Sequence, residues 1–158
     1  MSAALRWLPQ GTVYGALLNF RREWDLWAPQ MTEAPYKAAP QAPVLYIKTA
    51  NTFAPCGAAI AVPDEVDVGA TLGLVIGGFE EKLPPALAES AQAATKKEAG
   101  GLHRIAGCVL LNDLSLPHAS YYRPPIKFRN RDGFLGCGPV LQAVPDLSPL
   151  ALELRING

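Results

Sequence analysis

Apolar residues along this chain gather in short runs separated by proline- and glycine-rich segments, a pattern typical of a strand-rich fold. The run Val44–Lys48 is a clear example, an apolar strand that ends on a lysine. A turn, a short strand and a second turn are expected across 55–63. The other runs that predict strands are 12–18, 71–76, 105–111, 140–144 and 150–156.

Two segments have the spacing of helices instead. Residues 19–27 place Trp24 and Trp27 three positions apart, on one helix face. Residues 83–101 begin with two prolines, are rich in Ala and Glu, and end in two glycines, which predicts a helical insertion. The proline-rich stretch 29–43 breaks regular structure and predicts an ordered loop or lid. The expected fold class is therefore mixed β-rich, or α+β.

The last residues alternate apolar and polar side chains over 152–156 and then stop at Asn157-Gly158. Asn-Gly is the strongest two-residue signal for a β-hairpin, and a hairpin needs a returning strand. Since no residues for that strand follow, we expect residues 1–158 to form a single domain that is truncated at its C-terminal end.

Composition and charge narrow the possible functions. The 158 residues suffice for one domain with a real core, and 49% are hydrophobic, as in a globular protein. Fourteen basic and fourteen acidic residues cancel without any long basic run, which argues against a nucleic-acid partner. The apolar runs are well short of the ~18 residues of a membrane span. Three dispersed cysteines without a CxxC pair favour a reduced, cytoplasmic protein.

Two segments carry candidate chemistry. Asn112 and Asp113 end an apolar strand, and the glycine-rich segment 132–139 opens with Asp132. Basic side chains, including Lys127 and Arg129, come just before that turn. An acid at a strand end beside a cationic loop can hold a divalent metal and an anionic substrate. Asp113 has a simpler alternative role, which is to hydrogen-bond the turn that leads into the next residues.

The order and spacing of these segments resemble the fumarylacetoacetate hydrolase family from about residue 11 to residue 158. The resemblance implies a β-roll of packed sheets and a chemistry of 2-oxo acids and their enols. It is closer to one subgroup, the N-terminal half or first subunit of the bifunctional isomerase/decarboxylases of 4-hydroxyphenylacetate (homoprotocatechuate) breakdown. The segments that carry this closer resemblance are 34–38, 69–71, 116–117 and 122–127.

The resemblance also implies a metal site, formed in the family by a Glu-x-Glu pair on one strand and the Asp of the Asn-Asp motif. Alternate strand residues share a face, so such a pair can share one cation. Here the matching positions are Gly69 and Thr71, and only Asp113 remains. Asp67 is close, but its register does not suit a simple replacement. We therefore expect the family's Mg²⁺ or Mn²⁺ to bind weakly or not at all.

The family's lid helix carries a His and a Glu as an acid/base pair, and the matching positions here are Glu23 and Leu26. Glu23, or Asp25 nearby, could still move a proton, although a solvated helix face is the simpler reading. Arg129 stands where the family has a lysine. Because an arginine stays charged and forms a planar fork, it suits clamping a carboxylate better than transferring a proton.

The predicted catalytic residues are thus Glu23, Asp113 and Arg129. The predicted substrate-binding residues are Lys48, Asn112, Lys127 and Asp132. Lys127 and Arg129 are expected on one side of an extended segment, where they would hold an anion.

Two further residues suggest a nucleophile and its base. Ser115 and His118 are close in sequence, but no third partner is evident, and a surface histidine is the expectation.

Two hypotheses of different classes follow. The first is an enzyme that decarboxylates or isomerises 2-oxo (enol) di- or tricarboxylic acids in 4-hydroxyphenylacetate breakdown. The second is a non-catalytic subunit with a degenerate metal site that supports a homologous active subunit. Acylpyruvate hydrolysis is a third and less favoured reading, because it also depends on the missing metal and histidine. The expected partners are a small 2-oxo acid and either further copies of the chain or a homologous second subunit.

Overall fold

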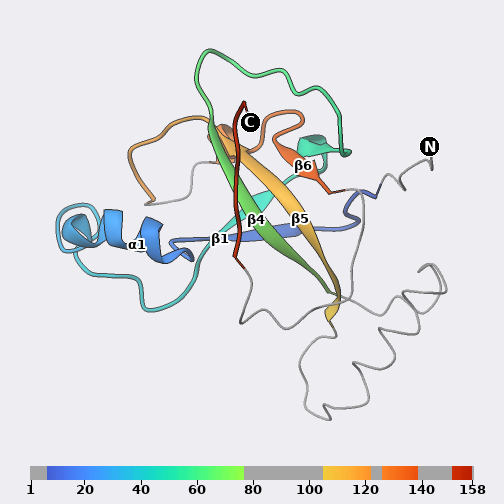
Figure 1. The fold of residues 1–158 in the computed structure, drawn as a ribbon. Coiled ribbons are helices and arrows are strands. Elements are labelled where there is room, and N and C mark those ends of the chain that lie inside the picture. The colour runs from blue at the N-terminus through green and yellow to red at the C-terminus, as the bar shows by residue number, and fades with distance from the viewer. Residues whose placement is uncertain (1–6, 77–104, 122–125, 139–150, 158) are drawn as a thin grey trace, which may run out of the picture.

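The computed structural model describes residues 7–76, 105–121, 126–138 and 151–157. Its strands form two sheets that lie against each other (Figure 1). The smaller sheet pairs β1 (Val13–Leu17) with β2 (Val44–Lys48) in antiparallel register. The larger sheet has the order β3–β6–β5–β4, from strands Phe53–Ala54 (β3), Leu135–Cys137 (β6), Ile105–Ser115 (β5) and Asp67–Ile76 (β4).

The long antiparallel pair of β4 and β5 sets the geometry of the larger sheet. Gly69 lies directly opposite Asp113, and the pairing continues to the far end, where the register shifts between Val75 and Ile76. Side chains alternate between the two faces of a strand. Asp113 therefore shares its face with residues 69 and 71 of β4, whereas Asn112 points to the opposite face.

One part of the core lies at the inner strand pair β5–β6 of the larger sheet. Its most deeply buried apolar side chains are Phe134, Leu135 and Cys137, on β6 and the residue before it. A second cluster covers the smaller sheet. It consists of Leu17, Leu18, Met31 and Tyr121, with Trp24, Trp27, Tyr36, Val44 and Tyr46 packed against it.

Aromatic rings hold the second cluster together. The rings of Tyr36 and Tyr121 stack with centroids 4.1 Å apart, and Trp27 meets Tyr121 edge-on at 5.3 Å. Trp27 comes from α1 (Arg21–Trp27), and Trp24 of the same helix packs against this cluster too, which confirms that both tryptophans share a face. Burial of these rings therefore fixes α1 against the smaller sheet.

The strands expected at 12–18, 44–48, 71–76 and 105–111 are all present, and the last two are longer than the sequence indicated. The short strand expected within 55–63 is wrong. It lies earlier, at Phe53–Ala54, because Pro55 cannot donate a ladder hydrogen bond and ends the strand. A 3₁₀ turn, η1 (Ala28–Gln30), follows α1, and turns occupy most of the proline-rich stretch.

Two further expectations about local structure are corrected. Residues 127–129 are not extended, since Ile126–Arg129 forms a helical turn, α3. The described part of the glycine-rich segment, 132–138, is a turn only at its start and then enters β6. The predicted helix at 83–101 and the strand at 140–144 fall outside the described residues.

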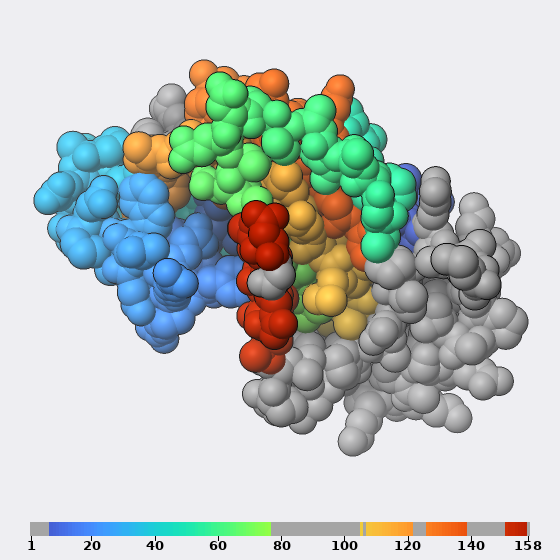
Figure 2. Space-filling view, turned by 45° about the horizontal axis from the view of Figure 1, so that its top comes forward, coloured from blue at the N-terminus to red at the C-terminus, as the bar shows by residue number. Residues whose placement is uncertain are grey.

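The C-terminal segment forms no strand in the structure, contrary to the alternation at 152–156. Residues 151–157 are all exposed and have no regular secondary structure. Figure 2 shows them as a stripe on the molecular surface. The left-handed conformation of Asn157, with φ of 61°, is the one that a hairpin turn would use, but a ladder for Leu152 to Ile156 is missing from the described part of the chain.

The described helices are all short. None of them has both the length and the apolar character that crossing a bilayer requires.

The three cysteines should differ sharply in reactivity. Cys56 is exposed, whereas Cys108 and Cys137 are buried, and burial raises the pKa of the Cys137 thiol to about 11. Because the thiolate is the reactive form, we expect a disulfide reagent at pH 8 to modify Cys56 quickly and the other two only after unfolding. Absorbance of the released thiolate measures both phases. Cys56→Ser should abolish the fast phase; a fast phase that survives this change would contradict the predicted packing.

Candidate functional site

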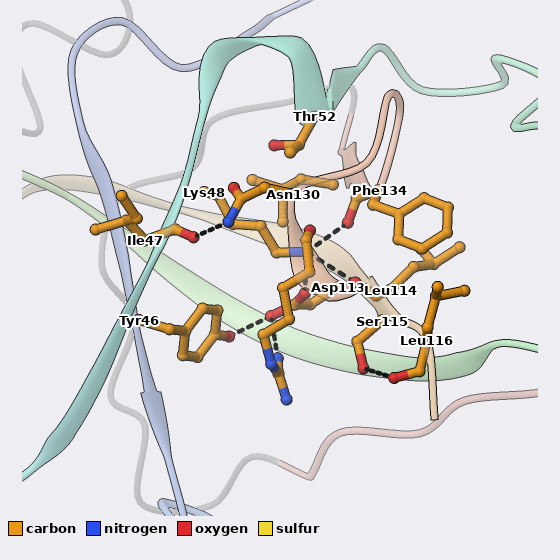
Figure 3. A network of polar contacts seen from close by, with 12 residues as sticks. Tyr46, Ile47, Lys48, Thr52, Asp113, Leu114, Ser115, Leu116, Asn130 and Phe134 are labelled. Carbon is orange, nitrogen blue, oxygen red and sulfur yellow. Dashed lines mark hydrogen bonds and ion pairs between the residues drawn. The ribbon is translucent and has the colours of Figure 1, made fainter. Parts of the chain in front are cut away.

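The candidate site is organised around the ammonium group of Lys48, which ends β2 and enters the larger sheet (Figure 3). Its Nζ donates hydrogen bonds of 2.8 Å each to the backbone carbonyls of Leu114, Arg129 and Phe134. These three bonds use every proton of the ammonium. Asp113 adds its charge, with Oδ1 only 2.6 Å from Nζ in a buried ion pair. Lys48 thus ties β2 to β5, α3 and the start of β6.

The second oxygen of Asp113 is also engaged. The hydroxyl of Tyr46 donates a short hydrogen bond to Oδ2, and the guanidinium of Arg129 lies 3.5 Å from the same atom. That guanidinium also sits over the Tyr46 ring, 4.4 Å from its centroid, as a cation–π contact. Tyr46 lies opposite Gly15 across the two-stranded sheet, and a Cβ at Gly15 would overlap its ring. A glycine there is what lets the tyrosine occupy this position.

Burial shifts the titration of both side chains from β2. It raises the pKa of Tyr46, and the neighbouring negative charge of Asp113 raises it further. Burial lowers the pKa of Lys48 by penalising its charged form, although Asp113 opposes that shift. The tyrosine therefore stays a neutral hydrogen-bond donor at neutral pH. Two cationic side chains, Lys48 and Arg129, thus flank the carboxylate of Asp113.

A separate group of polar contacts holds the turn before β6. Asn130 accepts a hydrogen bond from the backbone N–H of Thr49 at 2.7 Å and donates one to the carbonyl of Ile47 at 2.9 Å. Asp132 accepts a hydrogen bond of 2.7 Å from the side chain of Asn51. In this structure Asp132 is an exposed residue that supports the turn.

An open cavity of about 130 Å³ lies beside this network, between α1 and the larger sheet. Trp27 and Tyr121 form an aromatic wall, and Leu17 and Ser120 complete the neutral lining. Four charged or chargeable side chains line it, from three elements and one loop. They are Glu23 of α1, Asp67 of β4, His118 after β5 and Arg129 of α3.

The three predicted catalytic residues lie near one another, but only two of them line the cavity. Glu23 and Arg129 line the cavity directly, while Asp113 lies behind Arg129 with 8% of its side chain exposed. Glu23 is held in place because its Oε2 accepts a hydrogen bond of 3.0 Å from the backbone N–H of Leu18. The side chain of Lys48 is buried, and it stabilises this arrangement through its ion pair with Asp113.

The other predicted binding residues lie elsewhere. Lys127 is exposed, and its ammonium sits 4.8 Å from the centroid of the Phe128 ring. Residues two apart on a helix do not face the same way, so the expected common side for Lys127 and Arg129 is wrong. Asn112 points to the sheet face away from Asp113, where its buried Oδ1 has no hydrogen-bond donor among the described residues.

The residues at the family's metal positions do not fit a divalent cation. Gly69 and Thr71 offer no carboxylate beside Asp113, and both oxygens of Asp113 already face positive or donor groups such as Lys48 and Tyr46. A Cβ at Gly69 would come within 3.3 Å of the Asp113 carbonyl oxygen, so even a replacement side chain would require a shift. Within the described ranges, no three His, Cys, Asp or Glu side chains form a group that could hold a metal.

Sequence reasoning missed three residues that contribute to the Lys48 network or to the cavity. Tyr46 is two positions before Lys48 on the same strand, so alternation could have placed both on one face. Asp67 was set aside for its register, yet it lines the cavity from the start of β4. His118 is not the surface residue expected; it is partly buried, lines the cavity, and its Nδ1 lies 2.9 Å from the Leu116 carbonyl. Ser115, by contrast, is buried and donates to the same carbonyl.

Removing the buried ammonium should destabilise the whole domain. Lys48→Met takes one donor away from each of three carbonyls and the nearest cation away from Asp113, which we expect to cost about 3–5 kcal/mol of unfolding free energy. Urea denaturation measures the loss. Lys127→Met is the matched control and should stay within about 0.5 kcal/mol of wild type, because Lys127 is exposed. A loss in Lys48→Met no larger than in the control would contradict the central role of Lys48.

Divalent cations should find no strong site on this protein. We expect calorimetric titration with Mg²⁺ or Mn²⁺ to give no stoichiometric binding at micromolar affinity, because one already paired carboxylate is a poor ligand set. Asp113→Asn serves as the comparison. A micromolar site in wild type that disappears in Asp113→Asn would overturn this prediction.

Curated relatives are similar along nearly the whole chain. The "4-hydroxyphenylacetate degradation bifunctional isomerase/decarboxylase" of Escherichia coli is 37% identical over 152 residues, which cover 94% of this chain and 32% of the relative. The "Homoprotocatechuate catabolism bifunctional isomerase/decarboxylase" of the same species is 36% identical with the same coverage. The isomerase/decarboxylase of Salmonella dublin is 34% identical over 151 residues. The chain thus spans about a third of the length of these relatives.

Comparison with protein families places nearly the whole chain in one of them. The sequence model of the fumarylacetoacetate (FAA) hydrolase C-terminal family matches residues 12–158. That range includes both sheets, the Lys48 network and every residue that lines the cavity. The protein belongs to the fumarylacetoacetate hydrolase family.

Proposed function

We propose that this domain acts on 2-oxo (enol) di- or tricarboxylic acids, as a decarboxylase or enol–keto isomerase in 4-hydroxyphenylacetate catabolism. The observation that carries the proposal is the 37% identity, over 94% of the chain, to a relative named for that isomerase/decarboxylase activity. The cavity beside Arg129 supports it, because it joins one strong cation with groups that can transfer protons.

Arg129 is the best candidate for holding a substrate carboxylate. Arg129 lines the cavity, and its Nε is buried without an acceptor in the described part of the chain. A buried donor without a partner is costly, and a carboxylate that accepts from it would remove the cost. Asp113 and Tyr46 fix the guanidinium from behind, so little side-chain freedom remains to be lost on binding.

The chemistry of a 2-oxo acid gives the two cationic side chains beside Asp113 a use. When a carboxylate leaves as CO₂, or when an enol loses its proton, the electron pair moves onto the 2-oxo oxygen. Fixed positive charge near that oxygen stabilises the enolate that forms. Arg129 would supply this charge, with Lys48 contributing from a greater depth. Glu23, which also lines the cavity, can accept or return a proton.

The second candidate is a non-catalytic partner of a homologous active subunit. Gly69 and Thr71 at the family's carboxylate positions, and the internal pairing of Asp113, favour it. Because the relatives are about three times longer than this chain, their further segments suggest a homologous neighbour, or a second copy of the chain, as partner.

For both candidate functions we infer a β-roll of packed sheets and a cytoplasmic location, with weak or no binding of Mg²⁺ or Mn²⁺.

Substitutions of Arg129 and of Lys127 should affect ligand binding differently. Arg129→Gln removes a charge-assisted hydrogen bond of about 1.5–3 kcal/mol, so we expect binding of 2-oxoglutarate, an unreactive 2-oxo dicarboxylate, to weaken about 10- to 100-fold. Lys127→Gln is the control and should bind as wild type does, because its side chain is exposed and outside the cavity. Calorimetry measures both affinities, and thermal unfolding checks that each variant is folded.

The possible outcomes separate the two candidate functions. Equal affinity in wild type and Arg129→Gln would place the ligand elsewhere and refute the role of Arg129. Absence of binding in wild type would instead promote the partner-subunit hypothesis to first place.

A further inference from the structure

His118 is an ionisable residue of the cavity that the proposed function does not yet use. It follows β5, and its ring lines the cavity together with Glu23, Asp67 and Arg129. Those three side chains, from α1, β4 and α3, are the ionisable groups that share the lining with it. Ser120 and Tyr121 are the neutral polar neighbours on its own segment.

Two contacts fix the orientation of the His118 ring. Its Nδ1 lies 2.9 Å from the carbonyl oxygen of Leu116, and its ring stacks on Phe128 with centroids 5.8 Å apart and planes 13° from parallel. A carbonyl can only accept, so Nδ1 must carry a proton in both charge states of the imidazole. The remaining nitrogen, Nε2, is therefore the atom that gains and loses the exchangeable proton.

The same backbone segment connects His118 to the helix that carries Arg129. The N–H of Leu116 donates a hydrogen bond of 3.0 Å to the carbonyl of Phe128, the residue just before Arg129. This bond ties the segment that carries His118 to α3, which carries Arg129. Glu23 lines the cavity from α1, and the backbone N–H of Leu18, just after β1, holds its carboxylate.

We propose that His118 is a catalytic proton donor at its Nε2, working with Glu23 across the cavity on the enol–keto step; this rests on the proposed function. Tautomerisation breaks the enol O–H bond, makes the carbon–oxygen bond a carbonyl, and forms a C–H bond at the neighbouring carbon. The carboxylate of Glu23 accepts the enol proton, and protonated His118 delivers its Nε2 proton to the carbon. Proton transfer from Glu23 to His118 through water restores both groups, so no other reactant is needed.

Oxaloacetate, a small 2-oxo dicarboxylic acid whose enol absorbs in the ultraviolet, is the probe for this step. We expect His118→Gln to lower kcat for ketonisation of the enol about 100-fold, with little change in KM. The alkaline limb of the pH–rate profile should disappear, because the donor that loses its proton there is gone. Added imidazole should restore part of the rate in His118→Ala. A residue that only supports the fold would show neither effect.

Glu65→Gln is the matched control, since Glu65 is exposed and outside the cavity, and it should keep the wild-type rate. Binding of 2-oxoglutarate is measured in parallel. If wild type accelerates ketonisation and His118→Gln keeps the full rate and pH profile, the role of His118 is refuted while the proposed function stands. If wild type binds 2-oxoglutarate but does not accelerate ketonisation, the cavity only binds and the role of His118 is refuted. If wild type does neither, the proposed function fails, and this inference fails with it.

Discussion

The buried ammonium of Lys48 is the constraint on which the rest of the molecule depends. A charge taken out of water must be surrounded by good acceptors, and three backbone carbonyls together with Asp113 provide them. Those carbonyls belong to β5, α3 and the residue before β6, so satisfying one side chain fixes three separate chain segments. The two sheets are positioned by a polar contact as much as by apolar packing, and the candidate site lies at that contact.

The same network sets this site apart from one in which a metal ion would hold the anion. Asp113 is neutralised from within the protein, and Arg129 is held against it by Tyr46. A further cation would have to displace groups that also hold the fold together. Fixed positive charge beside Asp113 is therefore part of the polypeptide itself, placed by Lys48 of β2 and Arg129 of α3.

Sequence patterns predicted the long strands and α1 because burial on one face leaves a periodic signal in the order of residues. They also predicted Lys48, Asp113 and Arg129 as site residues, although their roles are untested. They missed β6 and α3, which are three and four residues long and too short for any periodicity to be seen. His118 was missed for a different reason. Its position is decided by a backbone carbonyl and an aromatic ring brought close by α3, and such contacts leave no mark in the spacing of residues.

The junction between β1 and α1 links the shape of the cavity to its chemistry. Leu18 adopts a left-handed backbone conformation, with φ of 61°, which is uncommon for a residue with a branched side chain. Its N–H is also the donor that holds the carboxylate of Glu23. A rotation of α1 relative to β1 would have to stretch or break that bond. The place of the Glu23 carboxylate in the cavity is consequently set by the same peptide unit that turns the chain from strand to helix.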